Sequence, residues 1–77
     1  MNIYKVSRTD SWAHGYDEYD SFVCAAESEQ TARDFVPGND RHAWVLEDNI
    51  SSLDVVLLGT AIDNFESGII LASFNAG

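Results

Sequence analysis

The residues best suited to chemistry lie in one acidic and aromatic segment, residues 10–20. Within eleven positions it carries four carboxylates and two flanking tyrosines, and it has no Lys or Arg. Carboxylates pair with guanidinium and ammonium groups, and tyrosine rings add cation–π contacts and contact area. The pattern therefore predicts a patch that binds a basic partner surface. The residues assigned to it are Tyr16, Asp17, Glu18, Tyr19, Asp20 and Asp10.

The same segment has two other interpretations. It could be a solvated connection whose aromatic rings fold back on the core, because a turn-rich run of twelve residues, 9–20, follows the first strand-like run. Clustered carboxylate oxygens also suit Ca²⁺. However, the run Asp17-Glu18-Tyr19-Asp20 lacks the ligand spacing and the turn-setting glycine of an EF-hand loop. We expect neither a metal nor a cofactor there.

Other reactive side chains are isolated in the sequence. His14 and His42 could bind zinc or act as bases, but neither has a second His or Cys at ligand spacing. Cys24, the only cysteine, lies in an apolar run, where a buried and unreactive thiol is expected. A glycine-rich phosphate loop and a Gly-x-Ser-x-Gly motif are both missing. We therefore expect a protein without enzymatic activity.

The elements that must position these residues follow from the apolar pattern. Residues 2–8, 20–26, 53–60 and 68–74 are rich in β-forming side chains. Ser28 is a suitable N-cap for a helix over residues 29–36, and Pro37 with Gly38 ends it. Short polar turns favour antiparallel pairing. We predict an α+β fold: an antiparallel four-stranded sheet with one short helix packed on one face, in the order β-β-α-β-β.

The core is expected on the central strands and on the apolar stripe of the helix. Residues 42–46 could add a short edge strand, and Trp44 within them is expected in the core. Trp12 could lie in the core or at the surface, and residues 75–77 are expected to fray. The predicted core side chains are Val55, Leu57, Ile69, Leu71, Phe22 and Phe35.

Size and charge limit the kinds of partner. A chain of 77 residues is expected to form a single domain, residues 1–77, with a core small enough that a homodimer is an open alternative. Its formal net charge of −9 repels nucleic acid and anionic membranes and attracts basic surfaces. No apolar run approaches the roughly 20 residues of a membrane span. The N-terminus has no signal-peptide pattern, and the free cysteine fits a reducing cytosol, so we expect an intracellular protein.

Several segments together resemble a group of small acidic proteins encoded in tailed-bacteriophage and prophage genomes. The most specific matches are the run 16–20 (YDEYD) and the C-terminal run 71–77 (LASFNAG). Residues 8–10, 26–33 and 58–61 also contribute, whereas residues 38–52 match least well. The resemblance implies a setting and not an activity. In that setting, small acidic proteins include inhibitors of host defence, such as anti-CRISPR proteins and DNA mimics.

The leading hypothesis is therefore a phage-encoded, non-enzymatic, anti-CRISPR-like inhibitor that acts in the host cytoplasm. It would bind a basic, nucleic-acid-binding surface of a defence complex, with carboxylates in place of phosphates, and would not itself bind nucleic acid or membrane. The alternative is a small phage structural or assembly protein that acts through self-association. If residues 16–20 do not contact the partner, the interface is expected on the helix, around Glu29, Arg33 and Asp34, or at the edge of the C-terminal strand.

Overall fold

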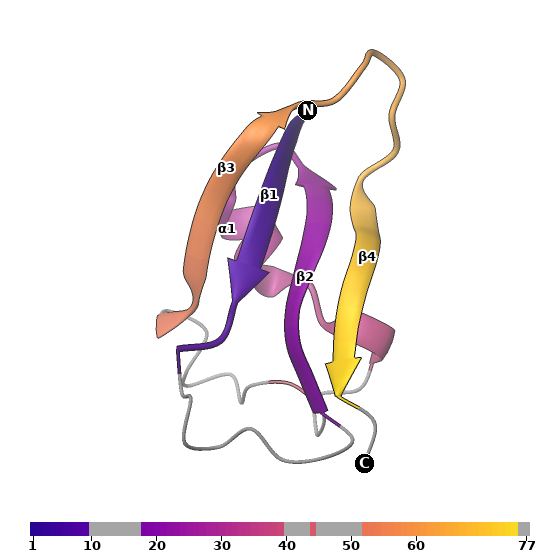
Figure 1. Cartoon of the computed structure of the whole chain (residues 1–77). Coiled ribbons are helices and arrows are strands. Elements are labelled where there is room, and N and C mark those ends of the chain that lie inside the picture. Colours follow the sequence, from indigo (N-terminus) through magenta and orange to yellow (C-terminus); the bar gives the residue numbers. More distant parts are fainter. Residues whose placement is uncertain (10–17, 40–43, 45–51, 76–77) are drawn as a thin grey trace.

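The computed structural model describes residues 1–9, 18–39, 44 and 52–75. These residues form an antiparallel four-stranded sheet and one short α-helix, which confirms the predicted α+β fold (Figure 1). A single turn of 3₁₀ helix, η2 (Pro37–Asn39), follows the α-helix. The strands are β1 (Asn2–Ser7), β2 (Glu18–Ala26), β3 (Asp54–Thr60) and β4 (Gly68–Asn75), and the helix is α1 (Glu29–Asp34).

The sheet has the strand order β3-β1-β2-β4, so the two N-terminal strands are central and the two C-terminal strands are edges. All three pairings are antiparallel. Residues 61–67 leave β3 on one edge, pass the end of the sheet and enter β4 on the other edge (Figure 1). Strands β3 and β4, which follow each other in the sequence, therefore lie at opposite edges of the sheet. Among the described residues, each of them has a strand partner along one edge and none along the other.

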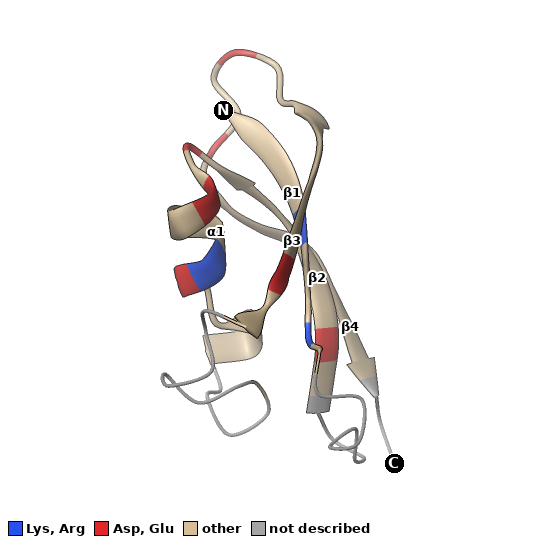
Figure 2. Ribbon diagram, turned by 90° about the vertical axis from the view of Figure 1, so that its left-hand side faces the viewer, with Lys and Arg blue, Asp and Glu red and all other residues tan. Residues whose placement is uncertain are grey.

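The period-two pattern of β1 explains why one face of the sheet is covered. Tyr4 and Val6 are buried and Lys5 is exposed, because successive side chains point to opposite faces. The register places Tyr4 opposite Cys24 and Val6 opposite Phe22, both of which are buried. The buried side chains of the two central strands thus share the face over which α1 lies (Figure 2).

The helix is short because its boundaries are fixed by local chemistry. The Ser28 side chain accepts a hydrogen bond from the Thr31 backbone N–H at 3.2 Å, which is the predicted N-cap. The helix ends at Asp34, two residues before the predicted limit, since Phe35 is already extended (φ −69°, ψ 144°). Pro37 accounts for this early end, because a proline disfavours helical geometry in the residue before it.

The core combines confirmed predictions with two errors. Phe22 is 1% exposed, as predicted, and Phe35, Val55 and Ile69 are partly buried against the core. Leu57 and Leu71 were predicted to be buried and are 59% and 69% exposed. The prediction took their strands as central, whereas both are edges. The described core residues are Tyr4, Val6, Phe22, Cys24, Ala26, Ala32, Trp44 and Leu53.

The middle of the chain is only partly described. The short strand predicted at 42–46 lies outside the described residues except for Trp44. That indole is buried, and its ring centroid lies 5.4 Å from that of Phe22, which confirms the predicted core position. Trp12 lies outside the described residues, as do two of the three C-terminal residues expected to fray. The third, Asn75, does not fray, because it is the last residue of β4 and pairs with Glu18.

Candidate protein-interaction surface

The predicted acidic and aromatic patch begins outside the described residues and ends inside β2. Asp10, Tyr16 and Asp17 belong to the part that is not described. Glu18 opens β2, and Tyr19 and Asp20 follow within the strand. The patch therefore includes the first residues of the central strand β2. The sequence did not indicate this overlap, because β2 begins two residues earlier than predicted.

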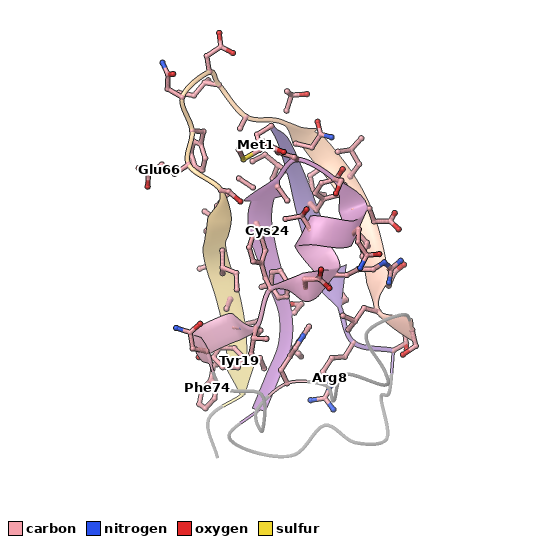
Figure 3. All side chains as sticks on the ribbon, turned by 180° about the vertical axis from the view of Figure 1, so that it is seen from behind. Met1, Arg8, Tyr19, Cys24, Glu66 and Phe74 are labelled. Carbon is pink, nitrogen blue, oxygen red and sulfur yellow. The ribbon has the colours of Figure 1, made fainter. Side chains whose placement is uncertain are left out.

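Tyr19 contributes to packing at this end of the sheet. Its ring lies edge to face with Phe74 of β4, with centroids 4.8 Å apart (Figure 3). Gly38 lies directly beneath the same ring: a Cβ built there would be 2.5 Å from the Tyr19 hydroxyl oxygen. The ring also packs against the partly buried edge of the core. Its predicted role as an anchor for a partner stays a prediction, and it would be shared with this internal contact.

Asp20 is half-buried and is held by local hydrogen bonds. Its side chain accepts a hydrogen bond from the Ser21 hydroxyl at 3.0 Å, and its backbone carbonyl accepts one from the Arg8 N–H at 3.0 Å. The Arg8 guanidinium donates to the carbonyl of Tyr19 at 3.4 Å. An arginine thus sits beside the predicted acidic patch and lowers its net negative charge at this end of β2.

A second group of carboxylates surrounds α1. Glu27, Glu29 and Asp34 are all exposed within eight residues, and we call them the acidic helix group (Figure 2). Arg33 donates to Glu29 at 3.1 Å along the helix, and also to the backbone carbonyl of Leu53 at 2.6 Å. That second bond ties the end of the helix to the start of β3. The arginine of this region is therefore engaged with its own chain, and the carboxylates around it face outward.

The feature that sequence reasoning missed is the amount of apolar side chain at the surface. The described residues include nine large hydrophobic side chains that are at least 39% exposed, and eight of them lie in β3, β4 and the connection between these strands. The sequence does not reveal the strand order. Because β3 and β4 were predicted to be central strands, their apolar side chains were not expected at the surface. The exposed side chains are Met1, Val56, Leu57, Leu58, Ile62, Phe65, Ile70, Leu71 and Phe74.

The face of the sheet opposite α1 has no described helix over it (Figure 2). The register places Lys5 between Val23 and Val56 on this open face, and Val23 pairs in turn with Leu71. Lys5 and Leu71 are exposed, and Val23 is half-buried. Among the described residues, the molecule thus presents an acidic side near the helix and a largely apolar open face that also carries Lys5 and Asp54.

The described residues provide no cluster of metal-ligating side chains. They include no group of three or more His, Cys, Asp or Glu side chains placed to hold a metal ion. His14 and His42 lie outside them. Cys24 is 0% exposed, as predicted, and burial raises the pKa of its thiol to about 11, against a smaller lowering by a backbone hydrogen bond from Tyr4. Within the same described residues, no helix has the length and apolar character that crossing a membrane requires.

Comparisons of the chain with family models, with curated proteins and with solved structures found no match.

Proposed function

We propose that this protein is a non-enzymatic binding protein that covers a basic surface of another protein. The observation that carries the proposal is an asymmetry of charge. Glu27, Asp63 and Glu66 are exposed carboxylates, whereas Arg33 bonds to its own chain. With a formal net charge of −9, the potential around the molecule is negative. Such a potential steers the protein toward basic surfaces and away from nucleic acid.

A basic surface that normally binds nucleic acid is the partner that fits best. Such surfaces bind mainly through Lys and Arg contacts to phosphates, and carboxylates can take the place of those phosphates in charge-assisted hydrogen bonds. Charge alone gives weak binding, because exposed ion pairs contribute little. The exposed apolar side chains of β3 and of its connection to β4 supply the contact area that charge cannot. Occupation of the surface then excludes the nucleic acid.

The phage resemblance suggests one class of target. A host defence complex that binds DNA or RNA in the cytoplasm would be inhibited by this mode of binding, as in the anti-CRISPR-like hypothesis. We propose the segment 16–20 with Asp10 as the first contact surface and the acidic helix group as the second. Both surfaces offer carboxylates to a basic partner, and binding through them needs neither a cofactor nor a catalytic residue.

Binding can be tested with the immobilised parent protein and a nuclease-treated bacterial lysate. The expected result is capture of a nucleic-acid-binding protein at about 0.1 M salt and its release by about 0.5 M salt, because screening weakens contacts between exposed charges. The captured protein, once purified, should lose its bound oligonucleotide when the parent protein is added. Capture that resists salt, or a captured protein that keeps its oligonucleotide, would contradict the proposal.

Three matched variants locate the contact surface. D17N/E18Q/D20N changes the predicted patch, E27Q/E29Q/D34N changes the acidic helix group, and D54N/D63N/E66Q changes β3 and its connection to β4. Each removes three carboxylates and raises the formal net charge by three, from −9 to −6. If the patch makes the contact, the first variant should lose affinity for the captured protein and the third should stay near the parent. Equal losses in all three would show that only total charge matters. Circular dichroism checks that each variant is folded.

A further inference from the structure

The outer edge of β4 carries no charged side chain and no proline. Native sheets usually protect an exposed edge with charged side chains, proline or a covering segment. β4 has eight residues, Gly68–Asn75, without a charge or a proline among them. Among the described strands it pairs only with β2, and Ile70, Leu71 and Phe74 on it are 48%, 69% and 46% exposed. In Figure 2 the strand carries neither acidic nor basic colour along its described length. An edge of this kind is a template for pairing with another strand.

The other edge of the sheet is less suitable. β3 begins with Asp54, whose side chain is exposed. Register shifts occur in both edge pairings, one between β1 and β3 and two between β2 and β4, so they do not distinguish the two edges. The helix α1, with its acidic group, packs on β2, β1 and β3. A second copy at the β3 edge would therefore meet the acidic helix, whereas one at the β4 edge would not.

We propose that two copies of this chain pair through β4, antiparallel, to form a continuous eight-stranded sheet. A closed dimer of identical chains uses the same surface on both copies. For antiparallel pairing of one strand with its own copy, the twofold axis is perpendicular to the sheet. Both α1 helices then lie on one side of the joined sheet and both open faces lie on the other. The proposal is independent of the proposed partner binding, although the dimer would present two acidic helix groups on one side.

Charge selects the antiparallel arrangement. Asp63 and Glu66 lie in the connection that enters β4 at Gly68, so a parallel pair would place these carboxylates beside their copies. An antiparallel pair separates them by about the length of the strand, roughly 27 Å at 3.4 Å per residue. The two helices would lie roughly 20 Å apart, at four strand spacings. Both distances exceed the Debye length of about 8 Å at physiological salt. The repulsion between two chains of −9 is therefore largely screened at this edge.

The area of the edge sets the strength of the dimer. A strand about 27 Å long in a sheet about 10 Å thick offers on the order of 300 Å² per copy. That is below the roughly 800 Å² per partner of a standard interface. The exposed side chain of Leu71 on the open face enlarges it. We therefore expect a weak, reversible dimer with a Kd of about 0.1–1 mM, in contrast to a permanent assembly.

Sedimentation equilibrium from about 10 µM to about 1 mM covers that range. The expected result is a monomer–dimer equilibrium that tightens as salt rises from about 0.05 M to about 0.5 M, because salt screens the like charges of the two copies. Binding to a basic partner should weaken over the same interval. The sign of the salt dependence thus separates failure of this proposal from failure of the proposed function.

Two matched variants identify the edge. Leu71→Lys should weaken dimerisation about tenfold or more, from the lost burial of one leucine on each copy. Because Lys also lowers the net negative charge, a loss cannot be assigned to added repulsion. Leu57→Lys, at a similarly exposed position on β3, should leave the equilibrium unchanged. Amide hydrogen exchange should slow with rising concentration in residues 70–74 and not in residues 56–58. A monomer at about 1 mM and 0.5 M salt, or equal effects of the two variants, would overturn the proposal.

Discussion

The central strands β1 and β2 and the edge strands β3 and β4 are similarly apolar in sequence and differ sharply in burial. Val6 and Cys24, in the central strands, are 0% exposed. Leu57 and Leu71, in the edge strands, are more than half exposed. The difference shows that the hydrophobicity of a strand does not decide its burial. What decides it is whether another element lies over the face and the part of the sheet that carry the side chain: Leu71 lies on the open face, whereas Val6 and Cys24 lie on the face with α1.

The length of α1 explains how far the cover extends. Six helical residues span about 9 Å, at 1.5 Å per residue. Four strands at about 4.8 Å spacing place the outer strand axes about 14 Å apart. A helix of this length therefore covers the central strands and only part of one edge. The apolar side chains at the edges are left for a partner or for a second copy.

The largest expected effect is the loss of a central core side chain. Phe22→Ala should lower the free energy of unfolding by about 3–5 kcal/mol, because it removes a fully buried ring that packs against Phe35 and Trp44. Urea unfolding followed by circular dichroism measures this difference. A loss below about 1 kcal/mol would show that the central strands do not hold the core, and the contrast between central and edge strands would fail.

The elements of the fold, their antiparallel pairing and the helix on one face could be predicted from the sequence, and the order of the strands in the sheet could not. Strand periodicity and the Ser28 cap are local signals, so the strands and the helix were placed within a few residues of their observed limits. Strand order depends on contacts between residues far apart in the chain, and no local pattern reports it. For this reason Leu57 and Leu71 were assigned to the core. The inward packing of Tyr19 against Phe74 depends on the same long-range pairing, so the sequence indicated the residue and not its contacts.

The buried thiol of Cys24, on the central strand β2, predicts a pH dependence of the free energy of unfolding. Burial raises its pKa from 9.0 to about 11. The native state therefore holds its proton to higher pH than the unfolded state, and the free energy of unfolding should be unaffected by this group below pH 9. Between pH 9 and about 11 it should fall, by at most about 3 kcal/mol, since each pKa unit equals about 1.4 kcal/mol.

Cys24→Ala provides the control for this effect, because it removes the thiol and leaves every other titratable group in place. The difference between the pH profiles of parent and variant isolates the thiol. It should be constant up to pH 9 and shrink at higher pH. A constant difference up to pH 11 would show that the thiol is not protected from ionisation by the sheet.

A smaller effect is expected where the central and edge strands are held together by the Tyr19 ring. Gly38 has φ 66°, a left-handed conformation that costs a residue with a Cβ about 1–2 kcal/mol. The added methyl would also meet the Tyr19 hydroxyl. Gly38→Ala should therefore lower the free energy of unfolding by about 1–3 kcal/mol. Gly59→Ala on β3, where a Cβ meets nothing within 4 Å, should be neutral or slightly stabilising.

Tyr19→Phe separates the two causes of that loss. Removal of the hydroxyl oxygen relieves the 2.5 Å approach, and it leaves the ring carbons Cζ and Cε2, at 3.1 and 3.2 Å, and the backbone conformation unchanged. The double variant Gly38→Ala with Tyr19→Phe should therefore recover part of the loss in a double-mutant cycle. If the single and double variants lose equal amounts relative to their parents, the hydroxyl oxygen does not contribute to the cost, which then lies in the backbone and the ring carbons.

The smallest expected effects belong to the exposed leucines of the edge strands. Leu57→Ala and Leu71→Ala should each change the free energy of unfolding by less than about 0.5 kcal/mol, the usual range for surface positions, in contrast to the several kcal/mol lost by truncation of a buried leucine. The measurement is urea unfolding at a protein concentration below the expected Kd, so that only the monomer is present. At higher concentration Leu71→Ala should become destabilising relative to Leu57→Ala, because association stabilises the folded state by mass action. A large loss of stability at both positions and at low concentration would mean that a further segment of the chain covers the edge strands. The contrast in burial between central and edge strands would then fail.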